Sequence, residues 1–107
     1  MSFAVKRDRD RRYSHLDPIG LFKEDEGITL ILKREQADAA KLYYISVFSM
    51  ITPSIHSSLE AVGFLAAIAN KLAEQDISVN PVSAYYHDHL FVPVSRAEEA
   101  MMLLEKY

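Results

Sequence analysis

The chain has 107 residues, of which 50% are hydrophobic and 25% are charged, as in an ordinary globular domain. A chain of this length buries about two thirds of the surface that its unfolded form exposes, so one domain or two small interlocked units can form without metal ions. The formal net charge of -3 argues against general binding to a nucleic-acid backbone. The sequence has no cysteine, which excludes thiolate catalysis and disulfide bonds.

Membrane insertion and secretion have no support in the sequence. The longest nearly apolar run, residues 61–69, has nine residues, whereas a membrane-crossing helix needs about 20. The first residues contain no apolar segment followed by a small-residue cleavage site. We therefore expect a cytoplasmic protein.

The first 17 residues differ in charge from the rest of the chain. They carry five Lys or Arg and three Asp, whereas residues 18–107 carry seven basic and twelve acidic side chains. Phe3 and Val5 predict a short strand, and the mixed charges after it are typical of a solvated loop rather than of a nucleic-acid arm.

A hairpin and a short helix are predicted next. Residues 19–24 and 28–32 have the alternation of strands, and the polar turn between them ends in Gly27, which can adopt a positive φ. Residues 33–42 are rich in helix-forming residues.

The second half begins with a strand that is apolar on both faces, over residues 44–52. Ser57 and Glu60 have the spacing of a capping box, and the apolar residues after them recur at helical spacing until near Gln75. Strands over 77–84 and 90–92 flank a polar turn, and Ser95 can cap a last amphipathic helix. This order predicts an α+β sandwich of ferredoxin-like type, with an antiparallel sheet and helices on one face.

The two halves of the chain resemble each other. Each has a hairpin followed by a helix that begins with a charged, Ala-rich segment, residues 34–40 in one and 96–100 in the other. The sequence predicts a first, incomplete unit over residues 1–43 and a second βαββα unit over residues 44–107.

Three segments of this sequence resemble a known family. They are the stretch from His56 to Phe64, the run Ile77-Ser78-Val79-Asn80, and the motif from Tyr85 to Pro93, with residues 22–32 fitting upstream. Together, over about residues 16–104, they resemble small bacterial proteins of unknown function built from two ACT-like units. Members of the family usually have a short helix before the first strand, whereas this sequence starts almost directly with the predicted strand at Ser2. This difference affects how one sheet edge is covered and how the protein oligomerises.

The resemblance implies a ferredoxin-like regulatory module that holds a small ligand, most often an amino acid, between two ACT-like units or two subunits. It also implies a homo-oligomer, which we expect to be a dimer. In such modules the ligand loop joins the first strand to the first helix, and here that loop is residues 52–58. A helix N-terminus also suits a carboxylate, so His56, Ser57 and Ser58 are predicted ligand contacts. The alternative is that Ser57 only caps its own helix.

Two further segments supply candidate residues. Tyr86, His87, Asp88 and His89 form an unusual polar cluster, and on an extended chain the two His side chains lie on one face and Asp88 on the other. They fit a ligand contact, a structural turn or, with His56, a metal site. Asn80 can donate and accept hydrogen bonds at once, although Asn before Pro also marks a strand edge.

Phe64 falls on the polar face of the long predicted helix and is therefore a candidate oligomer contact. Catalysis is not expected, because the sequence has no nucleophile elbow, Gly-rich phosphate loop or zinc-protease motif. The leading hypothesis is an amino-acid-binding regulatory module without a cofactor. A structural or interaction module is the alternative, and a His-based metal-binding protein is the third reading.

Overall fold

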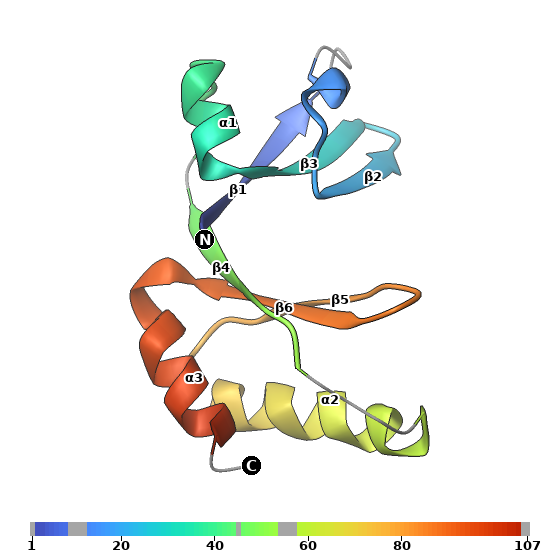
Figure 1. Cartoon of the computed structure of the whole chain (residues 1–107), viewed down its shortest axis with the longest axis vertical. Coiled ribbons are helices and arrows are strands. Elements are labelled where there is room, and N and C mark those ends of the chain that lie inside the picture. The colour runs from blue at the N-terminus through green and yellow to red at the C-terminus, as the bar shows by residue number, and fades with distance from the viewer. Residues whose placement is uncertain (1, 9–12, 45, 54–57, 106–107) are drawn as a thin grey trace. The chain divides into compact units, whose positions relative to one another are not determined.

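The computed structural model describes residues 2–8, 13–44, 46–53 and 58–105. The chain divides into two compact units, Met1–Phe48 and Ser49–Tyr107. The division lies a few residues after the boundary that the sequence suggested between residues 43 and 44. Each unit contains strands and at least one helix, as expected for an α+β protein (Figure 1).

The N-terminal unit is a three-stranded antiparallel sheet in the order β2-β3-β1 with one helix against it. Its elements are β1 (Ser2–Asp8), a 3-10 turn (Ser14–Leu16), β2 (Gly20–Glu24), β3 (Gly27–Lys33) and α1 (Arg34–Ala39). The helix packs on β1 and β3 (Figure 1). The core consists of Ala4, Ile28, Leu30, Leu32 and Ala37.

The basic segment after Val5 is not wholly a loop, which corrects the sequence interpretation. Lys6 pairs with Leu30, Arg7 with Thr29 and Asp8 with Ile28, so β1 continues through three charged residues. The seven-residue strand β3 offers backbone partners along this length, and ladder pairing satisfies the backbone groups whatever the charge of the side chains. Charge patterning alone therefore ended the predicted strand too early.

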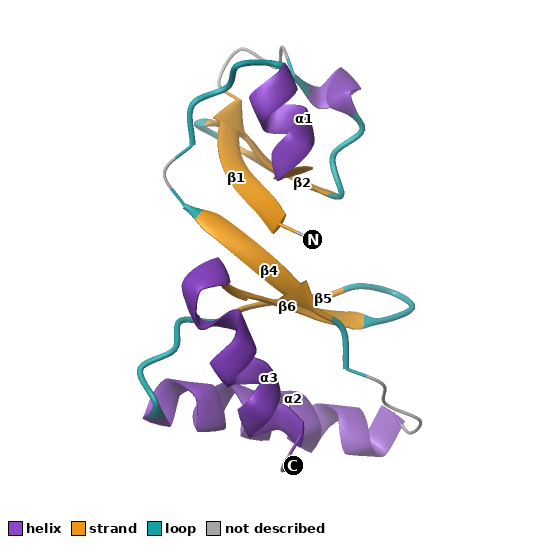
Figure 2. Cartoon of the chain, turned by 60° about the vertical axis from the view of Figure 1, so that its left-hand side comes forward, coloured by secondary structure: helices purple, strands orange, loops and turns teal. Residues whose placement is uncertain are grey.

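The C-terminal unit has strands in the order β4-β6-β5 and two helices. Its elements are β4 (Val47–Ile51), α2 (Ser58–Glu74), β5 (Asn80–Ser83), β6 (Asp88–Pro93), a 3-10 turn (Val94–Arg96) and α3 (Ala97–Glu105). Both helices lie on the same side of the β5–β6 hairpin (Figure 2). The core consists of Ile68, Leu72, Ile77, Leu90, Val92 and Ala100.

The predicted helices and the two hairpins are confirmed, with shifts at their ends. The strand predicted from Ile77 begins at Asn80, although Ile77 is buried and Val79 packs against the core. The strand predicted over 44–52 is shorter, at Val47–Ile51. A 3-10 turn at Val94–Arg96 precedes the last helix, which begins at Ala97.

The helices α1 and α2 end in the same way. After α2, the amide of Ile77 donates to the carbonyl of Leu72, and the amide of Asp76 donates to that of Ala73, both at 3.0 Å. After α1, Leu42 and Lys41 donate in the same pattern to Ala37 and Asp38. This is the Schellman arrangement, in which the residue after the cap is left-handed. Lys41 and Asp76 take that position with φ of 57° and 58°.

Both left-handed positions are expected to favour glycine. An L side chain in this conformation costs roughly 1–2 kcal/mol, part of which is offset by the greater chain entropy that glycine loses on folding. Lys41→Gly and Asp76→Gly should therefore each raise the free energy of unfolding by about 0.5–1 kcal/mol, as measured by urea denaturation. Lys33→Gly, at an extended residue, is the control and should lower stability. A loss of stability in Lys41→Gly and Asp76→Gly would contradict the assignment.

Candidate functional site

The β5–β6 hairpin sorts the predicted site residues onto two faces. Asn80 pairs with Phe91 and Val82 with His89, and opposite residues in an antiparallel pair point to the same side while neighbours alternate. Asn80 and His89 therefore share one face, and the ring of His87, which precedes the ladder, lies near that of His89. Leu90 and Val92 lie on the other, and both are fully buried in the core beneath the helices. Asn80 and His89 thus face away from α2 and α3.

His89 is joined to the start of the predicted ligand loop. Thr52 directly follows β4, and its Oγ1 lies 2.8 Å from Nδ1 of His89. The two residues are 37 positions apart in the chain. The neighbouring Ile51 packs into the core, so alternation along the strand is consistent with Thr52 projecting to the opposite side. This hydrogen bond brings together the loop and the hairpin that the sequence suggested separately.

The tip of the hairpin is aromatic and open to solvent. The amide of Ala84 donates to the carbonyl of His87 at 3.0 Å, which closes a turn around Tyr85 and Tyr86. Those two side chains are 92% and 83% exposed, with ring centroids 4.9 Å apart in an edge-to-face arrangement. Next to them, the exposed ring of His87 lies 6.2 Å from that of His89, centroid to centroid.

The outer strand β5 is protected against pairing with another strand. Residues of an antiparallel pair alternate between hydrogen-bonded and non-bonded positions, and the Ala84–His87 bond sets that alternation. Pro81, opposite Leu90, then falls at a non-bonded position. Its nitrogen, which has no hydrogen, faces the open edge, where Pro is tolerated and blocks strand addition.

Asp88 is half-buried opposite Ser83, on the other face from His89. His56 and Ser57 lie outside the described residues, and Ser58 is the first residue of α2. Phe64 is half-buried and packs against the core of the C-terminal unit, not on a wholly solvated face as the periodicity suggested. Its role at an interface stays a prediction, as does self-association.

Within the described ranges 2–8, 13–44, 46–53 and 58–105, no three His, Asp or Glu side chains gather as a metal-binding group. None of the helices there is both long enough and apolar enough to cross a membrane.

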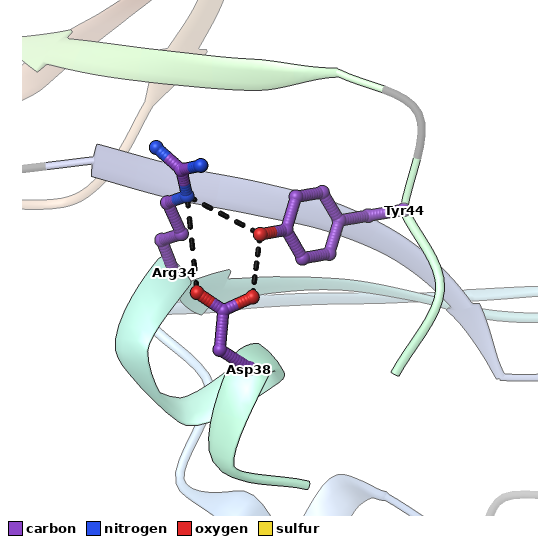
Figure 3. Close-up of polar contacts among 3 residues, drawn as sticks. All are labelled: Arg34, Asp38 and Tyr44. Atoms are coloured by element: carbon purple, nitrogen blue, oxygen red, sulfur yellow. Dashed lines mark hydrogen bonds and ion pairs between the residues drawn. The ribbon is translucent and has the colours of Figure 1, made fainter. Parts of the chain in front are cut away.

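A second polar cluster lies in the N-terminal unit and was not predicted (Figure 3). The Nε of Arg34 donates to the hydroxyl of Tyr44 at 3.2 Å, and that hydroxyl donates to Oδ1 of Asp38 at 2.5 Å. The hydrogen bond to Tyr44 is the main cause that raises the pKa of the Arg34 guanidinium above its usual value, and the Asp38 carboxylate adds to it. The cluster fastens α1 to the segment after it. Arg34 and Asp38 have the i,i+4 spacing of a helix ion pair, whereas no local pattern points to Tyr44 as their partner.

The hairpin face, the side of the β5–β6 hairpin that carries Asn80 and His89, also holds Val82 and Phe91, and Thr52 contacts it through His89. The sequence did not single out these three residues as site residues. Phe91, opposite Asn80, is 5% exposed. Thr52 belongs to the predicted loop, but nothing in the local pattern shows that its hydroxyl reaches a histidine 37 residues later. Val82 is opposite His89 and 40% exposed. Its place follows from the hairpin register, which depends on the turn.

Two solved structures are similar to the chain. One is the crystal structure of a protein of unknown function from Vibrio cholerae, described as a possible transport protein; it is 41% identical, with a TM-score of 0.87, over 98% of this chain and 82% of that one. The other, a crystal structure of a protein from Agobacterium tumefaciens, is 16% identical with a TM-score of 0.73, over 98% of this chain and 80% of that one, and it supports the fold alone. A comparison with curated proteins finds no match.

Family models match both parts of the chain. One model described as an ACT domain matches residues 2–49, and a second model with the same description matches residues 45–106. These matches confirm the resemblance drawn from the sequence and the predicted α+β ferredoxin-like fold. The chain belongs to the ACT-domain family, with one match in each half.

Proposed function

We propose that this protein is a regulatory module that binds an amino acid on the hairpin face of its C-terminal unit. ACT domains commonly bind small-molecule ligands in regulation, and residues 45–106 match such a domain. The proposed site consists of Thr52, Asn80, His87 and His89. We propose a binding rather than a catalytic role, in the cytoplasm, and self-association as in many ACT domains.

The hydrogen bond between Thr52 and His89 is the observation that carries this proposal. It fixes Thr52, in the loop between β4 and α2, against His89 of β6, and His87 directly precedes that strand. The loop is the segment that the family resemblance assigns to ligand binding, and the hairpin was assigned separately from its polar cluster. A direct side-chain contact between the two supports a single site.

The polar groups on this face suit an amino acid. Its ammonium group needs acceptors and its carboxylate needs donors, and a Thr hydroxyl, an Asn amide and an imidazole each supply both. Val82, exposed beside His89, adds an apolar contact for a ligand side chain.

A thermal-shift screen with the twenty amino acids tests the proposal. At least one amino acid should raise the Tm, since a ligand at 100 times its Kd stabilises the folded state by about 2.7 kcal/mol. For that amino acid, Thr52→Val and Asn80→Ala should each weaken binding about tenfold, the value of one hydrogen bond in a buried contact. Ser83→Ala, opposite Asp88, is the matched control and should bind as wild type does. No shift with any amino acid at millimolar concentration would contradict the proposal.

A further inference from the structure

We infer that His87 and His89 together bind one divalent transition-metal ion, with Thr52 positioning the His89 ring. The inference does not depend on amino-acid binding, because it concerns two imidazoles and a metal ion alone. It rests on the position of His87 two residues before His89, on the separation of their rings, and on the contact that holds His89 in β6.

The spacing of the two histidines is that of a chelating pair. His87 precedes β6 and His89 lies within it, so residues two apart project to the same side. An ion with metal–nitrogen distances of about 2.0–2.1 Å that joins two imidazoles holds ring centroids about 4.5–6.3 Å apart, depending on the angle at the metal. The observed separation of 6.2 Å is about 1 Å wider than the roughly 5.2 Å expected for a tetrahedral ion, so one ring has to move for both nitrogens to bind. His87 is exposed, so rotation of its ring can shorten the distance.

The contact with Thr52 involves Nδ1 of His89 and leaves Nε2 available to a metal ion. The Thr52 hydroxyl contacts Nδ1 at 2.8 Å, and in the tautomer in which Nδ1–H donates to Oγ1, Nε2 presents its lone pair. Metal-binding histidines typically make such a second hydrogen bond, which fixes the tautomer and the ring orientation. His89 is half-buried, which also limits its movement, whereas His87 is the adaptable partner.

The surroundings favour a cation that prefers nitrogen ligands. Residues 80–93 contain no Lys or Arg, and their one carboxylate is that of Asp88, between the two histidines in sequence. Imidazole suits Cu²⁺, Ni²⁺ and Zn²⁺, and affinity for Cu²⁺ should be the highest of the three. Two protein ligands leave the other coordination positions to water. Because protons compete for the same ring nitrogens, acidification should release the metal.

Calorimetric titration of the tag-free protein with Ni²⁺ or Cu²⁺ tests the inference. Wild type should bind one equivalent, and His87→Ala and His89→Ala should each lose that binding. His15→Ala removes an exposed histidine of the N-terminal unit, and this matched control should bind as wild type does. Absence of binding by wild type, or its retention in both hairpin variants, would overturn the inference.

Two further measurements distinguish a specific metal site from nonspecific metal binding by exposed histidines. Thr52→Val should weaken metal binding about tenfold or more, the usual effect of removing an outer hydrogen-bond partner, and Thr52→Ser should restore it. In NMR spectra, substoichiometric Cu²⁺ should broaden the ring protons of His87 and His89 before those of His15. Equal affinity in Thr52→Val would overturn the positioning role, and equal broadening of the three rings would overturn the site itself.

Discussion

Replacing Leu72 with alanine is expected to lower the free energy of unfolding of the C-terminal unit by about 2–5 kcal/mol. Leu72 is fully buried and belongs to the core cluster with Ile68, Ile77 and Leu90. The substitution removes apolar contacts and leaves a cavity that a close-packed interior fills only in part. Leu72 also accepts the hydrogen bond that ends α2, so the cavity would open beside the helix terminus. Urea denaturation followed by circular dichroism measures the effect.

Met102→Ala is the control for the Leu72 prediction. Met102 lies on α3 and is 57% exposed, so its truncation should change stability by no more than about 0.5 kcal/mol. If the two variants lose similar amounts of stability, Leu72 does not lie in a closed core and the packing described for the C-terminal unit is wrong.

The second large effect is expected at Gly27, where alanine should cost about 1–3 kcal/mol. Gly27 follows the turn between β2 and β3 with a φ of 147°, a conformation that residues with a side chain rarely adopt. Its partner across the hairpin is Glu24, whose carboxylate accepts a hydrogen bond from Thr29. A strained turn would therefore weaken pairing along the whole β2–β3 hairpin.

The same substitution at Gly63 should have the opposite sign. Gly63 lies inside α2, and a Cβ added there meets no atom within 4 Å. Because glycine inside a helix is less favourable than alanine, Gly63→Ala should raise stability by about 0.5–1 kcal/mol. Thermal denaturation of both variants decides the point, and destabilisation by Gly63→Ala together with tolerance of Gly27→Ala would contradict the backbone description.

Most of the fold could be predicted because local patterns and tertiary packing agree. The apolar residues of α2 recur at helical spacing, which predicts the helix, and Leu72 of the predicted stripe is fully buried. The buried face is not the predicted one throughout, because Ile68, outside that stripe, is buried whereas Ala66 and Ala73, within it, are exposed. In β3, Ile28, Leu30 and Leu32 alternate with partly exposed residues as the sequence predicted. Element ends were less predictable. The end of α1 is set by a left-handed Lys41, a conformation for which lysine gives no signal, and β1 runs through charged residues because β3 pairs with them.

The candidate site could be predicted only in part. Alternation alone separated Asp88 from the two histidines, and the hairpin register confirms that separation for His89. The contact between Thr52 and His89 could not be predicted. It depends on the order and register of β4 and β6, which decide whether the residue after β4 lies beside His89. For Phe64 the sequence pattern was misleading. Helical periodicity assigned this residue to the polar face of α2, but its side chain is partly buried against the core of the C-terminal unit.

NMR titration of the labelled protein with the amino acid that gives the largest thermal shift tests the proposed function most directly. We expect backbone shifts to saturate with one ligand per chain and to be largest around Thr52, Asn80, His87 and His89. They should be small along β2 of the N-terminal unit. Shifts confined to the N-terminal unit, or none at millimolar concentrations of the ligand, would contradict the assignment of amino-acid binding to the hairpin face.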